Sequence, residues 1–335
     1  GVCVFLFVVV GVLFFLFFFL WFCLVFFFFF VWLVFFVVFF VVLCFFVVVI
    51  YVDGTFGRGG HAGAILAMLG PEGRLLAMDK DPEAVQSAET KFGGDRRFAI
   101  EQGSFTMLGS MVARQDLQGK VNGLLLDLGV SSPQLDDASR GFSFSEEGPL
   151  DMRMDPTQGI GAAQWLNEAD EKEISRVLKT LGEERFSRRI ARAIVAQRAT
   201  QPLQTTRELA ELIAAAVPMR EKHKHPATRS FQAIRIFINS ELDDVRSVLE
   251  QVPDMLATHG RMAVISFHSL EDRIVKRFIR DEYRGEQPPR AFPLAGMDYQ
   301  PRLKPVGKAI RASEKEISEN PRARSAVLRI AERLQ

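Results

Sequence analysis

The segment Asp53-Gly-Thr-Phe-Gly-Arg-Gly-Gly-His61 combines residue types that can bind a charged ligand. Glycine permits positive φ angles and close approach of the backbone to a ligand, and the free N–H groups at a helix start favour an electron-rich partner. A β-type run precedes the glycines, and an apolar helical pattern over residues 62–69 follows them. The segment is therefore predicted to be a strand, a tight loop and a helix start that together cradle a cofactor.

A second acid follows this loop at the spacing found in nucleotide-binding folds. Asp79 lies 20 residues after Gly59, at the end of a predicted strand over residues 73–79, and Gly57-Arg-Gly-Gly-His-Ala62 fits the pattern G-x-G-x-x-A. Nicotinamide enzymes and methyltransferases both place an acid there to hold ribose hydroxyls. The loop alone leaves three interpretations open: a plain glycine-rich turn, an NAD(P)-dependent oxidoreductase and a methyltransferase.

Further strand-like runs bring more side chains to the same edge of a sheet. Strands are predicted over residues 97–101, 121–127 and 261–267, and a helix is predicted to begin at Asp81-Pro82. Strands that alternate with helical stretches indicate a parallel sheet with ligands at the carboxyl ends of its strands. The side chains expected along that edge are those of Asp53, Asp79, Phe105 and Asp127.

The pattern changes after residue 135. Residues 136–158 are rich in Gly, Ser, Pro and Asp and are predicted to form a long ordered loop. From residue 162 to about residue 250 only helical periodicity is found, which indicates a helical block inserted into the α/β domain. The helices predicted there cover residues 162–169, 171–181, 184–197, 206–217 and 228–249.

The helical block carries basic clusters that the formal net charge of +1 hides. Such clusters can neutralise the phosphates of a nucleic acid, but a solvated helix face has a similar composition. Both interpretations stay open at this point. The first cluster consists of Arg185, Arg188, Arg189, Arg192 and Arg198, and the second consists of Arg220, Lys222, Lys224 and Arg229.

His268 directly follows the predicted strand at residues 261–267. Ser269 and Asp272 have the spacing of a capping box for a helix over residues 271–280. A histidine at this point either belongs to a site or supports the helix start. The histidines show no zinc-binding spacing, so no metal is predicted, although a site at His223-Lys-His225 or an acid-rich Mg²⁺ site stays open. Residues 304–313 and 325–331 are predicted to close the sheet as a pair of strands.

Residues 1–50 differ from the rest of the 335-residue chain because they contain only Gly, Val, Cys, Phe, Leu, Trp and Ile. The run could span a bilayer twice at about 20 residues per helix. It lacks a polar turn, flanking basic residues and the features of a signal peptide. We favour the interpretation that this apolar low-complexity block is not native-like. All three cysteines lie in it, so residues 51–335 hold no disulfide, which fits a reducing cytoplasm.

Several segments taken together resemble one family, the bacterial RsmH/MraW methyltransferases, which methylate the exocyclic amine of a cytidine in small-subunit ribosomal RNA. The matching segments follow the family's order from residue 51 to the end, whereas the polar segment with which the family opens has no counterpart. They are Asp53-Gly-Thr-Phe-Gly-Arg-Gly-Gly-His61, Leu76-Ala-Met-Asp79, Leu126-Asp-Leu-Gly-Val-Ser-Ser-Pro-Gln-Leu135, Arg140-Gly-Phe-Ser-Phe144, Leu150-Asp-Met-Arg-Met154, His225-Pro-Ala-Thr-Arg-Ser-Phe-Gln-Ala-Ile-Arg235 and Ile265-Ser-Phe-His-Ser-Leu-Glu-Asp-Arg273.

This resemblance implies an α/β fold: a Rossmann-like class I methyltransferase domain that uses S-adenosyl-L-methionine and is interrupted by an all-helical substrate domain. The methyltransferase domain is expected to comprise residues 51–139 and 241–335, and the RNA-binding insertion residues 140–240. By the same resemblance, Gly59, Gly60 and His61 hold the methionine end of the cofactor. Asp79 then binds its ribose, Phe105 lies near its adenine, and Asp127 with Gln134 closes the pocket.

The reaction requires a group that accepts hydrogen bonds from the cytosine amine, and we assign this role to Asp127 or the adjacent backbone. Ser131, Ser132 and His268 are further catalytic candidates. Phe142 and Phe144 either form a platform for an extruded base or pack within their loop. The residues expected to bind RNA are Arg185, Arg188, Arg189, Arg192, Lys222, Lys224 and Arg229.

The expected partner is 16S rRNA within the small ribosomal subunit, and the expected location is the cytoplasm. A homodimer is left open, and no membrane association is expected. The alternatives are an NAD(P)-dependent oxidoreductase, supported only by the glycine pattern, and a membrane-anchored interaction protein in which the apolar block is genuine.

Overall fold

The computed structural model describes residues 48–218, 225–285 and 299–335. Residues 1–47 of the apolar block, and with them most of the proposed membrane anchor, lie outside these ranges, as do Arg220, Lys222 and Lys224. Within the described ranges no helix is long and apolar enough to cross a membrane.

The chain divides into two compact units. The described part of the smaller unit comprises Val48, Val49 and the turn Leu69–Gly73, in which the N–H of Gly73 donates to the carbonyl of Gly70 at 3.1 Å. The larger unit contains Ile50–Met68 and Arg74–Gln335, and all elements discussed below belong to it.

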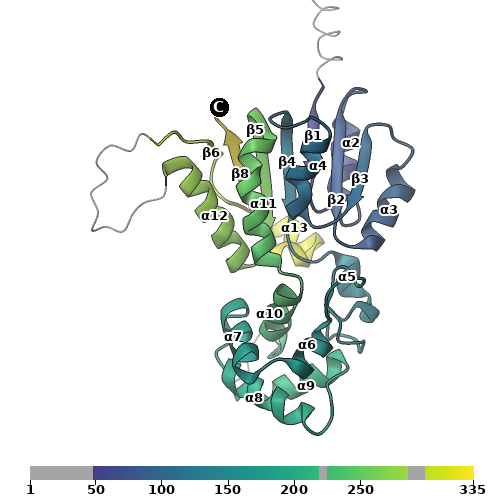
Figure 1. Cartoon of the computed structure of the whole chain (residues 1–335), viewed down its shortest axis with the longest axis vertical. Helices are drawn as coiled ribbons and strands as arrows, with labels where there is room; N and C mark the ends of the chain where they lie inside the picture. Colours follow the sequence, from purple (N-terminus) through teal and green to yellow (C-terminus); the bar gives the residue numbers. More distant parts are fainter. Residues whose placement is uncertain (1–47, 219–224, 286–298) are drawn as a thin grey trace, which may run out of the picture. The chain divides into compact units, whose positions relative to one another are not determined.

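Within the described residues, one eight-stranded sheet runs in the order β3-β2-β1-β4-β5-β8-β6, with β7 also paired to β8 (Figure 1). The first five strands are parallel, and β8 is antiparallel to β5, β6 and β7. The strands are β1 Ile50–Asp53, β2 Arg74–Asp79, β3 Phe98–Gln102, β4 Val121–Asp127, β5 Leu256–Ser266, β6 Leu303–Pro305, β7 Ile310–Arg311 and β8 Val327–Arg333.

Buried aliphatic side chains explain why the central strands lie inside the sheet. Val52 of β1 and Leu126 of β4 are fully buried, as expected for parallel strands covered on both faces. The pairing places Asp53 opposite Ala77 of β2 and Leu125 of β4. The prediction that acids end three neighbouring strands at one edge is therefore confirmed.

Helices flank the sheet and form a separate helical block. The helices of the α/β part are α2 Gly60–Met68, α3 Pro82–Phe92, η1 Phe105–Met107, α4 Leu108–Arg114, α11 Glu241–Met255, α12 Ser269–Arg284, α13 Glu314–Glu319 and η3 Pro321–Ser325. Those of the loop and the helical block are α5 Ser132–Asp136, η2 Ala138–Arg140, α6 Ala162–Glu168, α7 Glu171–Leu181, α8 Ser187–Arg198, α9 Thr206–Ala216 and α10 Thr228–Ile238.

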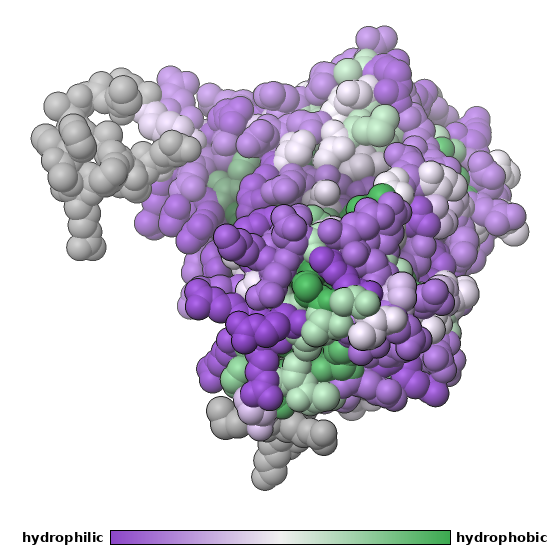
Figure 2. All heavy atoms as spheres, turned by 60° about the horizontal axis from the view of Figure 1, so that its bottom comes forward, coloured by the Kyte–Doolittle hydropathy of each residue, from purple (hydrophilic) through white to green (hydrophobic). Residues whose placement is uncertain are grey.

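Two separate apolar cores stabilise these elements. One joins the central strands to α4, α11 and α12, with Leu124, Val248 and Val275 among its members. The other joins α6 to α10 and includes Phe142 and Trp165. On the face seen in Figure 2, apolar side chains gather in a small central area within a mostly hydrophilic surface.

Three predicted elements differ from the structure. The helix expected over residues 228–249 breaks at Ser240, whose φ of 55° is left-handed. His268 rather than Ser269 caps α12, because the His268 side chain accepts from the N–H of Glu271 and the Glu271 side chain accepts from the N–H of His268. The closing strand expected over residues 304–313 is two short strands, β6 and β7, both paired to β8.

Candidate active site

The glycine loop joins β1 to α2 and is held against the end of β2. The N–H of Gly57 donates to Asp79 Oδ2 at 2.7 Å. Gly59 has a φ of 78°, and a Cβ there would lie 2.6 Å from Cζ of Phe56. Gly60 begins α2, and a Cβ there would meet no heavy atom within 4 Å. The loop therefore needs glycine at position 59 for its own folding, whereas position 60 leaves open space.

Asp53 lies at the centre of this edge and is fully buried. Its Oδ1 accepts from the N–H of Thr55 at 3.1 Å, whereas its buried Oδ2 has no hydrogen-bond partner. Burial raises the pKa of Asp53 to about 7, and the charges of Asp79 and Asp127 act in the same direction. An unpartnered buried carboxyl oxygen at a strand end is suited to a ligand that donates hydrogen bonds.

Asp127 ends β4 beside the loop. Its N–H donates to Thr55 Oγ1 at 2.6 Å, and its buried Oδ1 has no hydrogen-bond partner. Its Oδ2 lies 3.4 Å from Nε2 of His61, whose side chain is about half exposed at 51%. The hydrogen bond to Asp127 raises the pKa of His61. The pair thus presents one free carboxylate oxygen inward and one histidine towards solvent.

Asp79 receives two backbone donors, Gly57 at Oδ2 and Asp81 at Oδ1, the latter at 2.9 Å. Burial raises the pKa of Asp79 to about 6, although these N–H groups oppose the shift. An ionised carboxylate has about four acceptor positions. Capacity therefore remains at Asp79 for the hydroxyls of a ribose.

Asp81 joins several segments near the carboxyl ends of the strands through hydrogen bonds, a role that the sequence did not predict. Its Oδ1 accepts from the N–H of Glu83 at 3.0 Å, and Asp81 caps α3 as predicted. Its Oδ2 accepts from Gln134 Nε2 at 2.7 Å and from Arg140 Nη1 at 2.9 Å. Arg140 also donates to the carbonyls of Arg153 and Met154. This buried junction ties α3 to the 131–154 segment.

Both ends of the Gln134 amide are occupied within the protein. Gln134 Oε1 accepts from the N–H of Ser131 at 2.9 Å, and its Nε2 donates to Asp81. Ser131 caps the short helix α5, and Ser132 is exposed at its first turn. Phe105, at the start of η1, is partly buried against the main core, and its Cβ lies 3.4 Å from an ideal Cβ built on Gly54. Gln134 therefore shapes the segment that borders the carboxylates.

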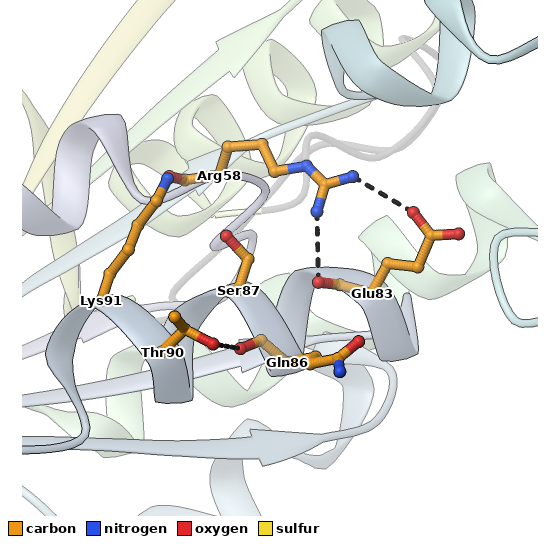
Figure 3. A pocket seen from close by; sticks show the side chains of 6 residues that line it. All are labelled: Arg58, Glu83, Gln86, Ser87, Thr90 and Lys91. Atoms are coloured by element: carbon orange, nitrogen blue, oxygen red, sulfur yellow. Dashed lines mark hydrogen bonds and ion pairs between the residues drawn. The ribbon is translucent and has the colours of Figure 1, made fainter.

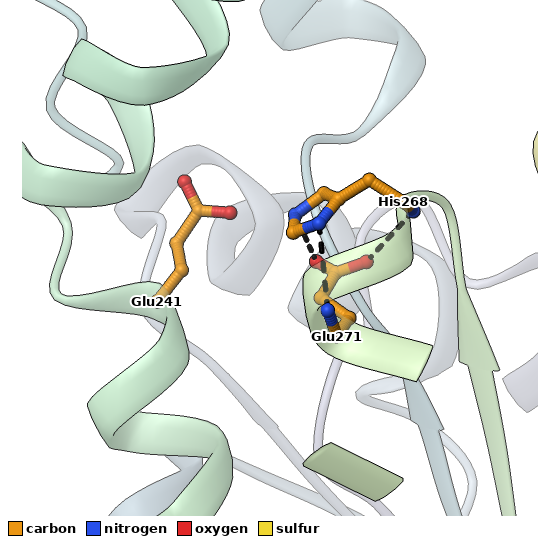
Figure 4. Close-up of side chains that lie close together, drawn as sticks. All are labelled: Glu241, His268 and Glu271. Atoms are coloured by element: carbon orange, nitrogen blue, oxygen red, sulfur yellow. Dashed lines mark hydrogen bonds and ion pairs between the residues drawn. The ribbon is translucent and has the colours of Figure 1, made fainter. Parts of the chain in front are cut away.

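His268 belongs to a different group of side chains, shown in Figure 4. Its Nε2 lies 3.1 Å from Glu271 Oε1 but is not aligned for a hydrogen bond. Burial would raise the pKa of Glu271, yet His268, Arg235 and the N–H of Phe267 together hold that pKa below its usual value. Ligand atoms of Glu241, His268 and Glu271 lie within 4.8 Å of one another.

Arg235 binds both oxygens of the Glu241 carboxylate. Its Nε donates to Oε1 at 2.8 Å and its Nη2 to Oε2 at 2.7 Å. This fork joins α10 to α11 and makes Glu241 a poor free ligand for a cation. An ideal Cβ on Gly129 would lie 4.0 Å from both Arg235 Nη2 and Phe267 Cδ2, so the group lies behind the segment that follows Asp127. His268 thus supports this segment, and no described contact joins it to Asp127.

A shallow surface hollow lies apart from the carboxylates (Figure 3). Arg58 of the glycine loop closes over α3 there and donates to the carbonyl and to Oε2 of Glu83, both at 3.2 Å. Lys91 donates to the Arg58 carbonyl at 2.8 Å. These contacts brace the back of the loop, and none of Asp53, Asp79 and Asp127 lines the hollow.

The arginines of the two basic clusters divide into two kinds. Arg185, Arg188, Arg189 and Arg192 are exposed on or beside α8, and within residues 48–218, 225–285 and 299–335 none of them makes an ion pair or hydrogen bond. Arg198 instead donates to the carbonyls of Leu166 and Ala169, both at 2.7 Å, and is structural. Arg229 is partly buried.

The aromatic pair proposed as a base platform packs within the protein. Phe142 is buried in the helical core, where the Arg140 guanidinium lies 5.8 Å from its ring centre. Phe144 contacts the rings of His225 at 4.7 Å and Phe231 at 4.8 Å. Loop packing, the alternative weighed from the sequence, describes both residues in this structure.

Comparison with known proteins identifies the chain. The MraW methylase family matches residues 43–334. The chain belongs to this family. It is also 62% identical to the ribosomal RNA small subunit methyltransferase H of Thioalkalivibrio sulfidiphilus (strain HL-EbGR7). That alignment spans 286 residues and covers 85% of this chain and 91% of that protein.

Solved structures of methyltransferases align with this MraW-family chain at low identity. An rRNA methylase from Streptococcus thermophilus aligns with 11% identity and a TM-score of 0.38, over 86% of this chain and 88% of that one. Fibrillarin of Aeropyrum pernix, in complex with natively bound S-adenosyl-L-methionine, aligns with 11% identity and a TM-score of 0.33. That alignment covers 84% of this chain and 65% of the fibrillarin chain.

Membership of the family makes the chain an S-adenosylmethionine-dependent methyltransferase. The described residues fit that cofactor, because the buried oxygens of Asp53 and Asp127 lack partners and the first turn of α2 is open at Gly60. The Rossmann-like α/β sheet agrees with this identity. The oxidoreductase interpretation, which rested on the glycine pattern alone, is not favoured.

Proposed function

We propose that this methyltransferase transfers a methyl group from S-adenosylmethionine to the N4 amine of a cytidine in 16S rRNA of the small ribosomal subunit. The observation that best supports the proposal is Asp127. Its unpartnered, buried Oδ1 stands at the end of β4, beside the glycine loop and next to His61. A carboxylate there can accept a hydrogen bond from an exocyclic amine.

The residues around Asp127 account for cofactor binding. Gly59, Gly60 and His61 are proposed to face the methionine end, Asp79 the ribose and Phe105 the adenine. Gln134 contributes by fixing the segment that borders this edge, since its amide is engaged with Ser131 and Asp81. When bound, S-adenosylmethionine supplies a methyl group that is already activated for transfer.

The chain's own residues orient and deprotonate the amine. Asp127 Oδ1 accepts one amine N–H and so aims the nitrogen lone pair, and orientation of this kind contributes on the order of 7 kcal/mol or more in favourable cases. Methylation leaves the nitrogen with one proton too many, which the Asp127 carboxylate can accept. His61 Nε2, 3.4 Å from Asp127 Oδ2, lies next to that carboxylate.

The second core supports a separate role for the helical block. We propose that residues 140–240 form an RNA-binding insertion in a catalytic domain made of residues 51–139 and 241–335. The exposed arginines Arg185, Arg188, Arg189 and Arg192 are its proposed phosphate contacts. The proposed location is the cytoplasm, where ribosomal RNA would be available as the substrate.

The test is transfer of labelled methyl from S-adenosylmethionine to small ribosomal subunits that lack the modification, followed by digestion and nucleoside identification. Labelled N4-methylcytidine is expected, and a different labelled nucleoside would overturn the proposal. At saturating cofactor, Asp127→Asn should lower the rate at least about 100-fold, the typical contribution of a positioned proton acceptor. Asp116→Asn makes the same change in an exposed loop and should keep the wild-type rate.

A further inference from the structure

Helix α12 separates its charges by face. Arg273, Lys276, Arg277 and Arg280 are exposed, and their spacing of three and four residues places them along one side of the helix. Val275 and Ile279 are buried on the opposite side. At 1.5 Å per residue, the four basic side chains form a stripe about 10 Å long.

The acids of α12 that could neutralise this stripe face other partners. Asp272 is bound by Arg329 of β8, with Nε to Oδ1 at 2.7 Å and Nη2 to Oδ2 at 3.1 Å. Glu282 is bound by Arg302 at 2.9 and 2.7 Å. Glu271 is buried and completes the capping box with His268. Only Asp281 pairs with a member of the stripe, Arg280, at 2.7 Å.

Two members of the stripe have no acidic partner among the described residues. Lys276 and Arg277 make no ion pair or hydrogen bond within the part of the chain that the structure describes. An ordinary solvated helix face intersperses acids and bases in pairs four residues apart. On α12 the acids are instead engaged by arginines from β8 and the segment before β6, which leaves positive charge on the outward side.

The stripe also contacts the segment that leads into α8. Arg273 Nη2 lies 3.4 Å from Glu183 Oε1, and Glu183 is two residues before Arg185. This contact places the exposed bases of α12 near Arg185, where the α8 arginine cluster begins, although about 80 residues or more separate them in the sequence.

We propose that the outward side of α12, centred on Lys276 and Arg277, binds the phosphate backbone of the substrate RNA next to the α8 arginines. This inference rests on the proposed function, since it concerns the same RNA. One strand of a nucleic acid duplex carries a phosphate about every 3.4 Å along its axis, so a 10 Å stripe matches about three phosphates. The contact reads charge and not sequence.

The test compares two double variants that each remove one lysine and one arginine. Lys276→Gln/Arg277→Gln alters the stripe. Arg74→Gln/Lys120→Gln is the control, because these exposed residues lie at the amino ends of β2 and β4, opposite the ligand edge. Binding to small ribosomal subunits that lack the modification is measured from 50 to 300 mM salt, together with cofactor affinity and thermal stability.

The stripe variant should lower the slope of log affinity against log salt by about 1.4 to 1.8, that is, 0.7 to 0.9 for each lost phosphate contact. Counterion release alone then predicts roughly 14- to 30-fold weaker binding at 0.15 M salt. Cofactor affinity and unfolding temperature should stay at wild-type values. The swap Lys276→Arg/Arg277→Lys, which keeps both charges, should retain the wild-type slope.

A stripe variant with the wild-type slope and affinity would overturn the inference, as would an equal loss in the Arg74→Gln/Lys120→Gln control. The proposed function fails in a different way. In that case the wild-type enzyme itself would not label the cytidine amine of the small subunit, whatever the α12 variants do.

Discussion

Two adjacent glycines, Gly59 and Gly60, should respond in opposite ways to the same added methyl group. Gly59→Ala puts a Cβ on a residue with a φ of 78°, which costs about 1–2 kcal/mol. The new atom would also lie 2.6 Å from Phe56 Cζ and 2.8 Å from Phe92 Cε2. Phe56 is buried and packs on Phe92 and Phe98, so its ring has little room to move. Overpacking of this kind adds about 1–3 kcal/mol.

The total for Gly59→Ala is therefore roughly 2–5 kcal/mol. At about 2–4 °C per kcal/mol for a domain of this size, the unfolding temperature should fall by roughly 4–20 °C. Gly60→Ala meets open space and has no positive φ. Reduced freedom of the unfolded chain should stabilise it by about 0.4–1 kcal/mol. The two variants differ by one position and by the sign of their effect on stability.

Measurements with and without a cofactor analogue distinguish an effect on folding from an effect on ligand binding in Gly59→Ala and Gly60→Ala. Thermal unfolding is recorded with and without S-adenosylhomocysteine, the demethylated cofactor. Without ligand, Gly60→Ala should be slightly more stable than the wild type, but it should gain less stability from the ligand, because its methyl group lies where the cofactor is proposed to bind. Gly94→Ala, an open position with no positive φ after α3, is the control. Wild-type stability of Gly59→Ala would refute the loop argument, and a full ligand response of Gly60→Ala would remove that residue from the site.

Three further predictions concern stability without cofactor. Because burial raises the pKa of Asp53 from 3.8 to about 7, the folded state holds a proton that the unfolded state releases. The stability that Asp53 contributes is then lost as pH rises from about 4 to 7, on the order of 4 kcal/mol. Urea unfolding of Asp53→Asn should lack this part of the decline and keep the part due to Asp79, whose pKa is also raised. A pH profile parallel to that of the wild type would contradict the assignment. Arg140→Met leaves the buried Asp81 carboxylate without its arginine partner and should lower the free energy of urea unfolding by about 3–5 kcal/mol. Adding Asp81→Asn should restore part of that free energy. A loss below about 1 kcal/mol would refute the role of the junction. Ser240→Gly relieves a φ of 55° and should raise the free energy of unfolding by up to about 1 kcal/mol, whereas a loss of stability would show that the serine side chain matters there.

The sequence predicted best where local chemistry decides the structure. The glycines after Asp53 specify a tight turn into a helix, and Asp81 with Pro82 specifies a helix start, because each acts through its own backbone. The acids at the ends of β1, β2 and β4 could also be placed, since hydrophobic runs mark where buried strands stop.

Prediction failed where distant residues decide. The helical pattern of the sequence continues through Asn239, but the chain turns at this residue. Asn239 Oδ1 accepts from the N–H of Met154, and Asn239 Nδ2 donates to the carbonyl of Met152. Asp272 fits the expected capping box but is bound by Arg329, so Glu271 takes its place. Histidine is not a preferred cap, and no local signal distinguished the two alternatives.

For Gln134 the role in the site stays a prediction. The family resemblance named it as a residue that closes the cofactor pocket, but its amide is bound to Ser131 and Asp81. The sequence does show that Arg140 lies beside Gly141 and two residues before the aromatic Phe142, which could have indicated a structural role for this arginine. Its actual partner, Asp81, is 59 positions away and could not be read from the pattern.

The place of β8 in the sheet bears on how the protein emerges from the ribosome that makes it. β8 lies between β5 and β6, yet it follows β5 by about 60 residues, from Ser266 to Val327. At about 5–20 residues per second, the edge of β5 waits roughly 3–12 s for its partner during translation. An unpaired edge invites pairing with other chains. A nascent chain of this enzyme therefore passes through an aggregation-prone interval that ends only when β8 is synthesised.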